Sequence, residues 1–225
     1  MSDPANSVTP SGPSRGAVID LLGLVAYGQL LAFDRMAADA RLAPDLDRRA
    51  MLSEMAAAEI AHYRRLADRL AEFDVTAEAA MAPFRDSLLG YHDSTVPHDW
   101  LEALTKAYVG DAIADDFLRE VAELLGEPDR RLLLDVLHDT RYADFAAVEI
   151  RSALTADPTL AHRLSMWARR LVGEALSQAN RVAAARPPLI TLIGRGTGDP
   201  AGVQALFRRL TTAHTARMSA VGLNN

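Results

Sequence analysis

One pair of residues in the sequence has the types and the spacing of metal ligands. Glu59 and His62 stand three positions apart, and on a helix this spacing places a carboxylate and an imidazole side by side. Both groups bind iron and similar metals, whereas the chain has no cysteine and therefore no thiolate ligand and no disulfide. Alone, this pair is a weak signal, because a single buried histidine is more often hydrogen-bonded within the core than bound to metal.

Polar residues also interrupt the apolar stripes of three other segments. Gln29 falls on the stripe of the first segment, Asp111 and Asp115 on that of a later one, and Asp139 and Tyr142 on that of the next. Apolar residues at helical spacing face a core. We therefore expect these polar side chains to point inward as well.

The positions of these residues along the chain place them at one depth. The midpoint of Gln29 and Glu59 and the midpoint of Asp115 and Asp139 both fall in predicted turns, so each pair is level across its hairpin. Asp111 lies about half a turn off this level, and the spacing leaves open which of Asp111 and Asp115 faces the site. Buried carboxylates need a compensating cation or dense hydrogen bonding. The pattern therefore predicts a metal site or a core in which arginines and tyrosine hydroxyls neutralise the carboxylates.

The segments that carry these residues are predicted to be helices of an all-α protein, because their apolar residues recur at spacings of three and four and no segment alternates like a strand. Pro and Gly residues divide the chain into six predicted helices, at 16–42, 46–72, 98–125, 129–156, 158–185 and 201–221. Two antiparallel hairpins joined by a long crossover at 73–97 describe a ferritin-like four-helix bundle. We expect residues 1–15 to be a disordered tail, residues 16–225 a single domain with its bundle at 16–156, and residues 158–221 two accessory helices.

Composition limits the class of protein. The chain has 225 residues, of which 49% are hydrophobic and 24% charged, as in an ordinary globular domain. No stretch reaches the about 18 uninterrupted apolar residues of a membrane span, so we expect a soluble, cytoplasmic protein with no membrane partner.

The charge of the chain is unevenly distributed. Residues 1–150 hold 14 Lys and Arg against 27 Asp and Glu, a net charge of −13, while residues 151–225 hold 10 Arg against 3 acids, a net charge of +7. A basic third of this kind suits phosphate groups, such as those of a nucleic acid.

Longer stretches of the sequence resemble a known family. They are DLLGLVAYGQLLAFDRMAADARLAP (20–44), MAAAEIAHYRRL (55–66), AMAPF (80–84), KAYVGDAIADDF (106–117), RRLVGEALSQA (169–179) and LTTAHTARMSAVGL (210–223). Together they resemble the actinobacterial ferritin-like proteins related to MiaE, the tRNA 2-methylthio-isopentenyladenosine hydroxylase. The resemblance runs from about residue 20 to residue 223.

This resemblance implies a non-haem di-iron monooxygenase that hydroxylates a modified tRNA base, with the arginine-rich C-terminal third holding the tRNA. It implies four iron ligands, which are Glu59, His62, Asp111 and Asp139. The chain departs from the family pattern at two positions, because Gln29 stands where the family has Glu and Tyr142 where it has His. A neutral amide binds ferric iron poorly, and a tyrosine must lose its proton before it can ligate.

Two polar residues in the similar C-terminal stretches have two interpretations. Glu174 and His214 lie beside the predicted site or its substrate entrance, or they form a salt bridge between the fifth and sixth predicted helices; we favour the salt bridge.

Three functional hypotheses follow. The first is an iron- and dioxygen-dependent hydroxylase. The second is a ferritin-like protein without a metal, with a structural or protein-binding role, and Gln29 and Tyr142 motivate it. The third, iron storage, needs a homo-oligomeric shell, and the sequence shows no interfaces for one. The substrate, the electron donor and the oligomeric state do not follow from the sequence.

Overall fold

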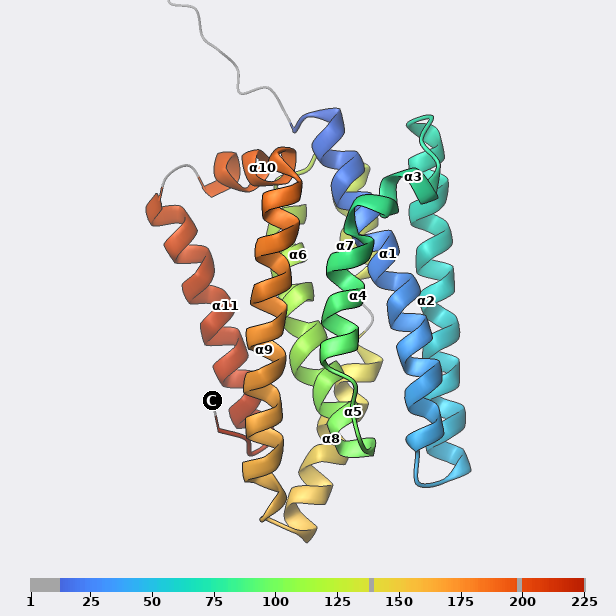
Figure 1. Cartoon of the computed structure of the whole chain (residues 1–225), viewed down its shortest axis with the longest axis vertical. Helices are drawn as coiled ribbons and strands as arrows, with labels where there is room; N and C mark the ends of the chain where they lie inside the picture. Colours follow the sequence, from blue (N-terminus) through green and yellow to red (C-terminus); the bar gives the residue numbers. More distant parts are fainter. Residues whose placement is uncertain (1–12, 138–139, 198–199, 225) are drawn as a thin grey trace, which may run out of the picture.

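The computed structural model describes residues 13–137, 140–197 and 200–224, and within them every regular element is a helix. The first hairpin consists of α1 (Arg15–Asp39), the short η1 (Ala40–Leu42) and α2 (Leu46–Glu72). Ser14 caps α1 and Asp45 caps α2, each with its side chain accepting a hydrogen bond from the first turn. The bounds agree with the prediction, and the two helices run antiparallel along one side of the molecule (Figure 1).

The crossover between the hairpins is itself largely helical, which the sequence analysis did not predict. It contains α3 (Ala77–Met81), η2 (Ala82–Phe84) and α4 (Arg85–Ser94). The start of the crossover lies close against α1, because a Cβ atom on Gly23 would stand 2.3 Å from the carbonyl oxygen of Ala80. Only glycine permits this approach of the two backbones.

The second hairpin differs from the prediction in both of its helices. Its first half comprises α5 (Trp100–Thr105), the π-helical η3 (Lys106–Asp111) and α6 (Ala112–Ala122). Its second half is α7 (Asp129–Val136) and α8 (Arg141–Ala156), so the single helix predicted at 129–156 was wrong. Thr140 precedes α8, and its hydroxyl donates to the Asp144 carboxylate at 2.9 Å. Short polar side chains of this kind favour helix ends over helix interiors.

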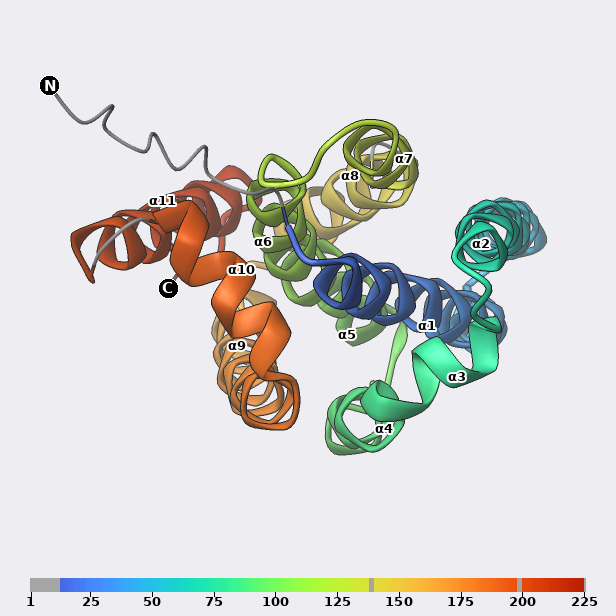
Figure 2. The same cartoon turned by 90° about the horizontal axis from the view of Figure 1, so that it is seen from above.

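The C-terminal part forms a second layer on the bundle. It comprises α9 (Leu160–Ala185), α10 (Pro187–Thr197) and α11 (Pro200–Ala220). The prolines at 187 and 188 were predicted to end a helix, and they also begin α10, where proline at a first helical position is tolerated. Viewed from above, α9 to α11 lie on the opposite side of the molecule from α2 (Figure 2).

Two apolar clusters fill the interior at different depths. One contains the N-terminal half of α1 with Leu66, Leu70 and Phe84, and the other contains Met36, Leu52 and further residues of η3, α8 and α9. The polar positions singled out in the sequence occur on α1, α2, η3 and α6 between the residues that build these two clusters. The candidate site is therefore a polar layer near mid-bundle.

The segment Arg15–Leu42 is long and apolar enough to cross a membrane by composition, and 56% of its most apolar window is buried inside the bundle. A core helix of a folded bundle has the same composition, so the segment is weak evidence for a membrane span.

Candidate functional site

The predicted pair on α2 is present and mostly enclosed. The Nδ1 atom of His62 lies 3.4 Å from Oε2 of Glu59, and both side chains are about 85% buried. On α1, the amide oxygen of Gln29 is buried and has no hydrogen-bond partner in the part of the chain that the structure describes. These three residues therefore point into the structure, as their stripes predict.

The predicted ligand Asp111 takes part in an ion pair that the sequence analysis did not predict. Arg35 of α1 donates from Nη1 to Oδ1 of Asp111 at 2.5 Å, and its Nη2 lies 2.5 Å from Oδ2 of the same carboxylate. Arg35 is 8% exposed, and its Nε lies 3.9 Å from Oδ2 of Asp39 one turn further along α1. Burial lowers the pKa of the Arg35 guanidinium, but Asp111, Tyr142 and Asp39 together raise it, so Arg35 is firmly charged.

A second cation lies in the same layer. Lys106, the single lysine of the chain, is 1% exposed, donates from Nζ to the carbonyl oxygen of Thr95 at 2.8 Å and lies 5.2 Å from the centre of the Tyr91 ring. Burial and the nearby Arg35 lower its pKa to about 8. The same two causes, with Lys106 itself, lower the pKa of the neighbouring His92 to about 3, so this imidazole is neutral.

Two tyrosine hydroxyls in this layer, those of Tyr91 and Tyr142, are buried and have no hydrogen-bond partner among the described residues. The Tyr142 ring lies 5.9 Å from the Arg35 guanidinium carbon, and burial raises the pKa of both phenols. Tyr142 is therefore a neutral phenol beside a cation. A predicted role as a phenolate ligand would require a metal to displace its proton.

Asp115, the other aspartate candidate, lies on α6 in a half-buried position. Burial and the charge of Asp111, opposed by Arg119 and helped by Glu59, raise the pKa of its carboxyl to about 7. The two aspartates therefore have different partners in this layer. Asp111 binds Arg35, and Asp115 is the carboxyl that interacts electrostatically with Glu59.

The π-helix explains why both aspartates reach the layer. Residues Lys106–Asp111 add a wider turn to the rod formed by α5 and α6, and such turns often occur at functional sites. Upstream, Asp99 caps α5 by accepting from the amide of Glu102 at 2.9 Å, which fixes where this rod begins. A signal for Arg35 and Lys106 existed in the sequence, because both are charged residues inside strongly apolar segments.

The described residues, which do not include the predicted ligand Asp139, do not by themselves fit a di-iron centre. Both oxygens of Asp111 are engaged by Arg35, and no three His, Asp or Glu side chains among the described residues are grouped so that they could hold a metal ion. A di-iron bundle uses about six ligands from four helices. The predicted ligand Asp139 lies outside the described residues.

The two C-terminal candidates remain predictions in their roles. Glu174 on α9 is half-buried and contributes to the raised pKa of Tyr91, which places it near α4. His214 on α11 is buried.

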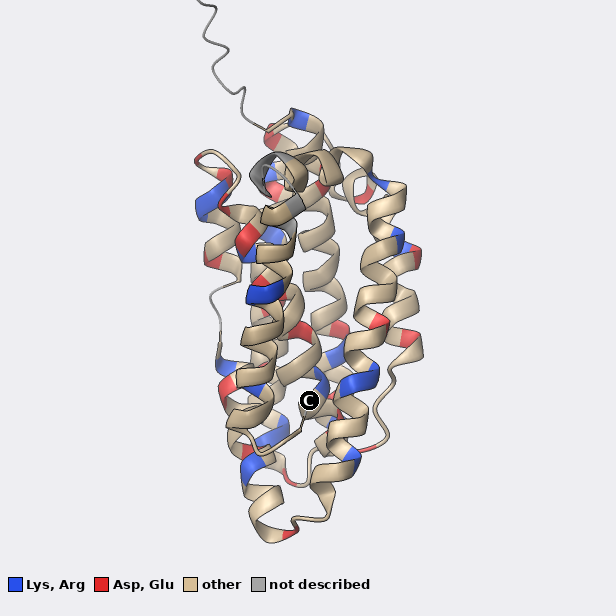
Figure 3. Ribbon diagram, turned by 90° about the vertical axis from the view of Figure 1, so that its left-hand side faces the viewer, with Lys and Arg blue, Asp and Glu red and all other residues tan. Residues whose placement is uncertain are grey.

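Several C-terminal arginines form ion pairs with acids of the preceding helices. Arg163 binds Asp99 and Glu102 at 2.6 and 2.9 Å, and Arg209 binds Glu120 at 2.7 Å. Likewise, Arg186 binds Asp20, and Arg217 binds Asp116 at 2.6 Å. Basic and acidic residues alternate along this side of the molecule (Figure 3). The charge asymmetry of the sequence therefore serves, in part, to hold α9, α10 and α11 on the bundle.

The fold and the layout of the polar layer define a ferritin-like helical protein. The sequence matches the family model of a ferritin-like domain of actinomycetes over residues 14–196, which is more than half of the chain. The chain belongs to this family. No curated protein matches the sequence.

Proposed function

We propose that this chain is a metal-independent ferritin-like protein whose bundle has a structural or protein-binding role. The observation that carries the proposal is the close ion pair between Arg35 and Asp111, in which one hydrogen bond joins the two side chains. One Asp111 oxygen accepts a hydrogen bond from Arg35 and the other lies 2.5 Å from its Nη2, so a metal ion would have to compete with a buried cation for this carboxylate. A metal at this position would also stand beside a fixed positive charge.

Gln29 and Tyr142, the two residues that differ from the family pattern, are neutral, and they support the same proposal. Gln29 offers an amide oxygen in place of a carboxylate, and the pKa of Tyr142 is raised rather than lowered. Each change removes negative charge or an imidazole that would stabilise ferric iron. Glu59 and His62 remain together, but they hydrogen-bond to each other.

Iron loading tests the proposal directly. The full chain is incubated with Fe(II) and dioxygen, passed through a desalting column and analysed for iron by mass spectrometry, with dioxygen uptake recorded during loading. We expect well under one iron per chain and no uptake above that of buffer. Retention of about two irons per chain would overturn the proposal.

A second candidate is the hydroxylase that acts on a modified tRNA base. It is favoured by the pairing of Glu59 with His62 and by the electrostatic coupling of Glu59 to Asp115. Those residues, with Asp139, would hold a metal ion that activates dioxygen.

The tRNA part of this candidate has its own test. Arg169 and Arg170 donate to the backbone carbonyls of Asn224 and Ser94, so their charges have no carboxylate partner in these bonds. If tRNA binds there, affinity falls steeply with salt, because bound phosphates release counterions. The double variant Arg169→Ala/Arg170→Ala then binds more weakly and with a shallower salt slope. Undetectable binding at low salt would remove this candidate.

A further inference from the structure

Two cations and two carboxylates lie close together on one side of the polar layer. Arg35 and Lys106 are the cations, and Asp39 and Asp111 are the carboxylates nearest to them. Arg35, Lys106 and Asp39 are each less than a tenth exposed. Because buried charge is costly unless it is paired, these four groups must be considered together.

Arg35 occupies the central position among these groups. Its guanidinium holds both oxygens of Asp111 at 2.5 Å and faces Asp39 at 3.9 Å, so it lies between carboxylates of α1 and η3. In a metal-holding bundle, a cation that bridges carboxylates from different helices makes the same connection.

We propose that the Arg35 guanidinium takes the place of a metal ion in this bundle, neutralising Asp111 and Asp39 and joining α1 to η3. The inference rests on the proposed function, because a chain that also binds two irons would not need a substitute cation. It adds to that function the residue that makes the bundle independent of metal.

A gain of metal binding follows if Arg35 is removed. Truncating its side chain leaves space at the centre of the layer and leaves Asp111 without its partner, with Asp39 and the unpartnered Tyr142 hydroxyl nearby. A divalent cation would then relieve the repulsion that the guanidinium relieves in the natural chain. A purely structural arginine predicts loss of stability alone, with no new affinity for metal.

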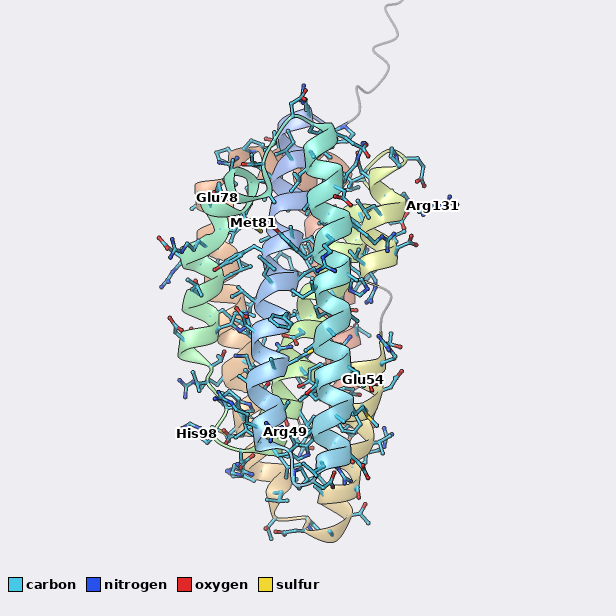
Figure 4. The ribbon with its side chains drawn as sticks, turned by 90° about the vertical axis from the view of Figure 1, so that its right-hand side faces the viewer. Arg49, Glu54, Glu78, Met81, His98 and Arg131 are labelled. Carbon is cyan, nitrogen blue, oxygen red and sulfur yellow. The ribbon has the colours of Figure 1, made fainter. Side chains whose placement is uncertain are left out.

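The experiment uses Co²⁺ as the probe, read by its visible absorption and by the melting temperature of the full chain. We expect Arg35→Ala to melt below the natural chain, to bind Co²⁺ at least tenfold more tightly and to regain part of the lost melting temperature. Arg35→Ala/Asp111→Asn should lose this gain, because the carboxylate that receives the ion is gone. Arg49→Ala is the matched control, since Arg49 is exposed on the outer side of α2, near Glu54 and far from Glu78 and Met81 at the α3 end (Figure 4).

Every outcome decides the inference. If Arg35→Ala folds only when Co²⁺ is present, the inference is supported. If Arg35→Ala binds Co²⁺ no better than the natural chain, it is overturned. Arg35→Gln, which keeps most of the side-chain volume, covers failure of the alanine variant to fold; if neither variant folds or binds with Co²⁺, the inference is also overturned. Iron retained at two per natural chain would instead remove the proposed function, so the two failures are distinguishable.

Discussion

The contact between Arg35 and Asp111 is worth more to the protein than an ordinary surface ion pair. The arginine is almost wholly buried, while the Asp111 side chain keeps 31% of its exposure. Exposed pairs contribute little, but removing one partner of a buried pair leaves an uncompensated charge in a poorly solvated place. The pair should therefore influence stability strongly.

We predict that Asp111→Ala lowers the free energy of unfolding by about 2 to 3 kcal/mol, somewhat less than for a fully buried pair because Asp111 is partly solvated. Urea denaturation followed by circular dichroism measures this loss. The apolar double variant Arg35→Leu/Asp111→Leu should recover part of it, since the Arg35–Asp111 pair is then removed whole and only Asp39 loses its cation. A double variant as unstable as the sum of its single variants would contradict this account.

The raised pKa of Asp115 predicts a pH dependence of stability. Its folded pKa of about 7 exceeds the value of 3.8 expected in the unfolded chain, so the native state holds this proton more tightly. The resulting stability is fully present below about pH 4 and is lost as pH rises towards 7. Asp111, Glu59 and Asp116 raise this pKa, and Arg119 lowers it.

We therefore expect Asp115→Asn to stabilise the protein at pH 8 by about 1 to 4 kcal/mol and to have much less effect at pH 4.5. Chemical denaturation at the two pH values gives the comparison, with Asp135→Asn, at an exposed carboxylate, as the control. An equal effect of Asp115→Asn at both pH values would show that its carboxyl is not protonated in the native state.

Residue types and spacing predicted some of the residues in this layer but not the two cations at its centre. The stripe that carries Gln29, and the pairing of Glu59 with His62, follow from helical periodicity, and the structure buries these groups. Arg35 and Lys106 were missed because long cationic side chains on apolar helices usually reach solvent. Arg35 is buried against Asp111, and Lys106 against the carbonyl oxygen of Thr95, and both contacts form only in the folded chain.

At the scale of the element, the side chain of Tyr91 on α4 reaches the π-helix Lys106–Asp111. A Cβ atom added to Gly110 would stand 2.3 Å from the Tyr91 hydroxyl oxygen, and that hydroxyl has no hydrogen-bond partner. The glycine thus makes room for the end of one tyrosine side chain. Removing that hydroxyl group should make room for a larger residue.

We predict that Gly110→Ala destabilises the protein by about 1 to 3 kcal/mol through overpacking. Tyr91→Phe alone should be nearly neutral, because it removes an unpaired buried hydroxyl. In Gly110→Ala/Tyr91→Phe the coupling should restore most of the stability, as measured by a double-mutant cycle from urea denaturation. Additive effects of the two substitutions would place Tyr91 elsewhere.

The element boundaries show where sequence reasoning fails. The helices at 16–42 and 46–72 were predicted closely because proline, capping residues and long apolar stripes define them. The crossover helices α3 and α4 were missed, since they are short and depend on packing against α1 and α9. The break between α7 and α8 was missed because the apolar spacing continues across it.

At the scale of the whole molecule, the uneven charge of the sequence has an intramolecular role. Arg186 reaches Asp20 of α1, and Arg209 and Arg217 reach Glu120 and Asp116 of α6. The pair between Arg217 and Asp116 is the less exposed of the two α6 contacts, so it should contribute most to holding α11 in place.

We expect Arg217→Met to speed amide hydrogen exchange in α11 by about five- to tenfold, which corresponds to a loss of about 1 to 1.4 kcal/mol in local stability. Mass spectrometry of peptides from residues 204–220 provides the readout. Arg208→Met, at an exposed position on the same helix, should change exchange little. Equal effects of the two substitutions would mean that α11 is held by apolar packing alone.

The most direct test of the account is an anaerobic calorimetric titration of the full chain with Fe(II), followed by thermal melting with and without the metal. Because Arg35 already neutralises the carboxylates at the centre, we predict no saturable binding at two ions per chain and an unchanged melting temperature. Saturation at two Fe(II) per chain with a melting temperature several degrees higher would contradict the account.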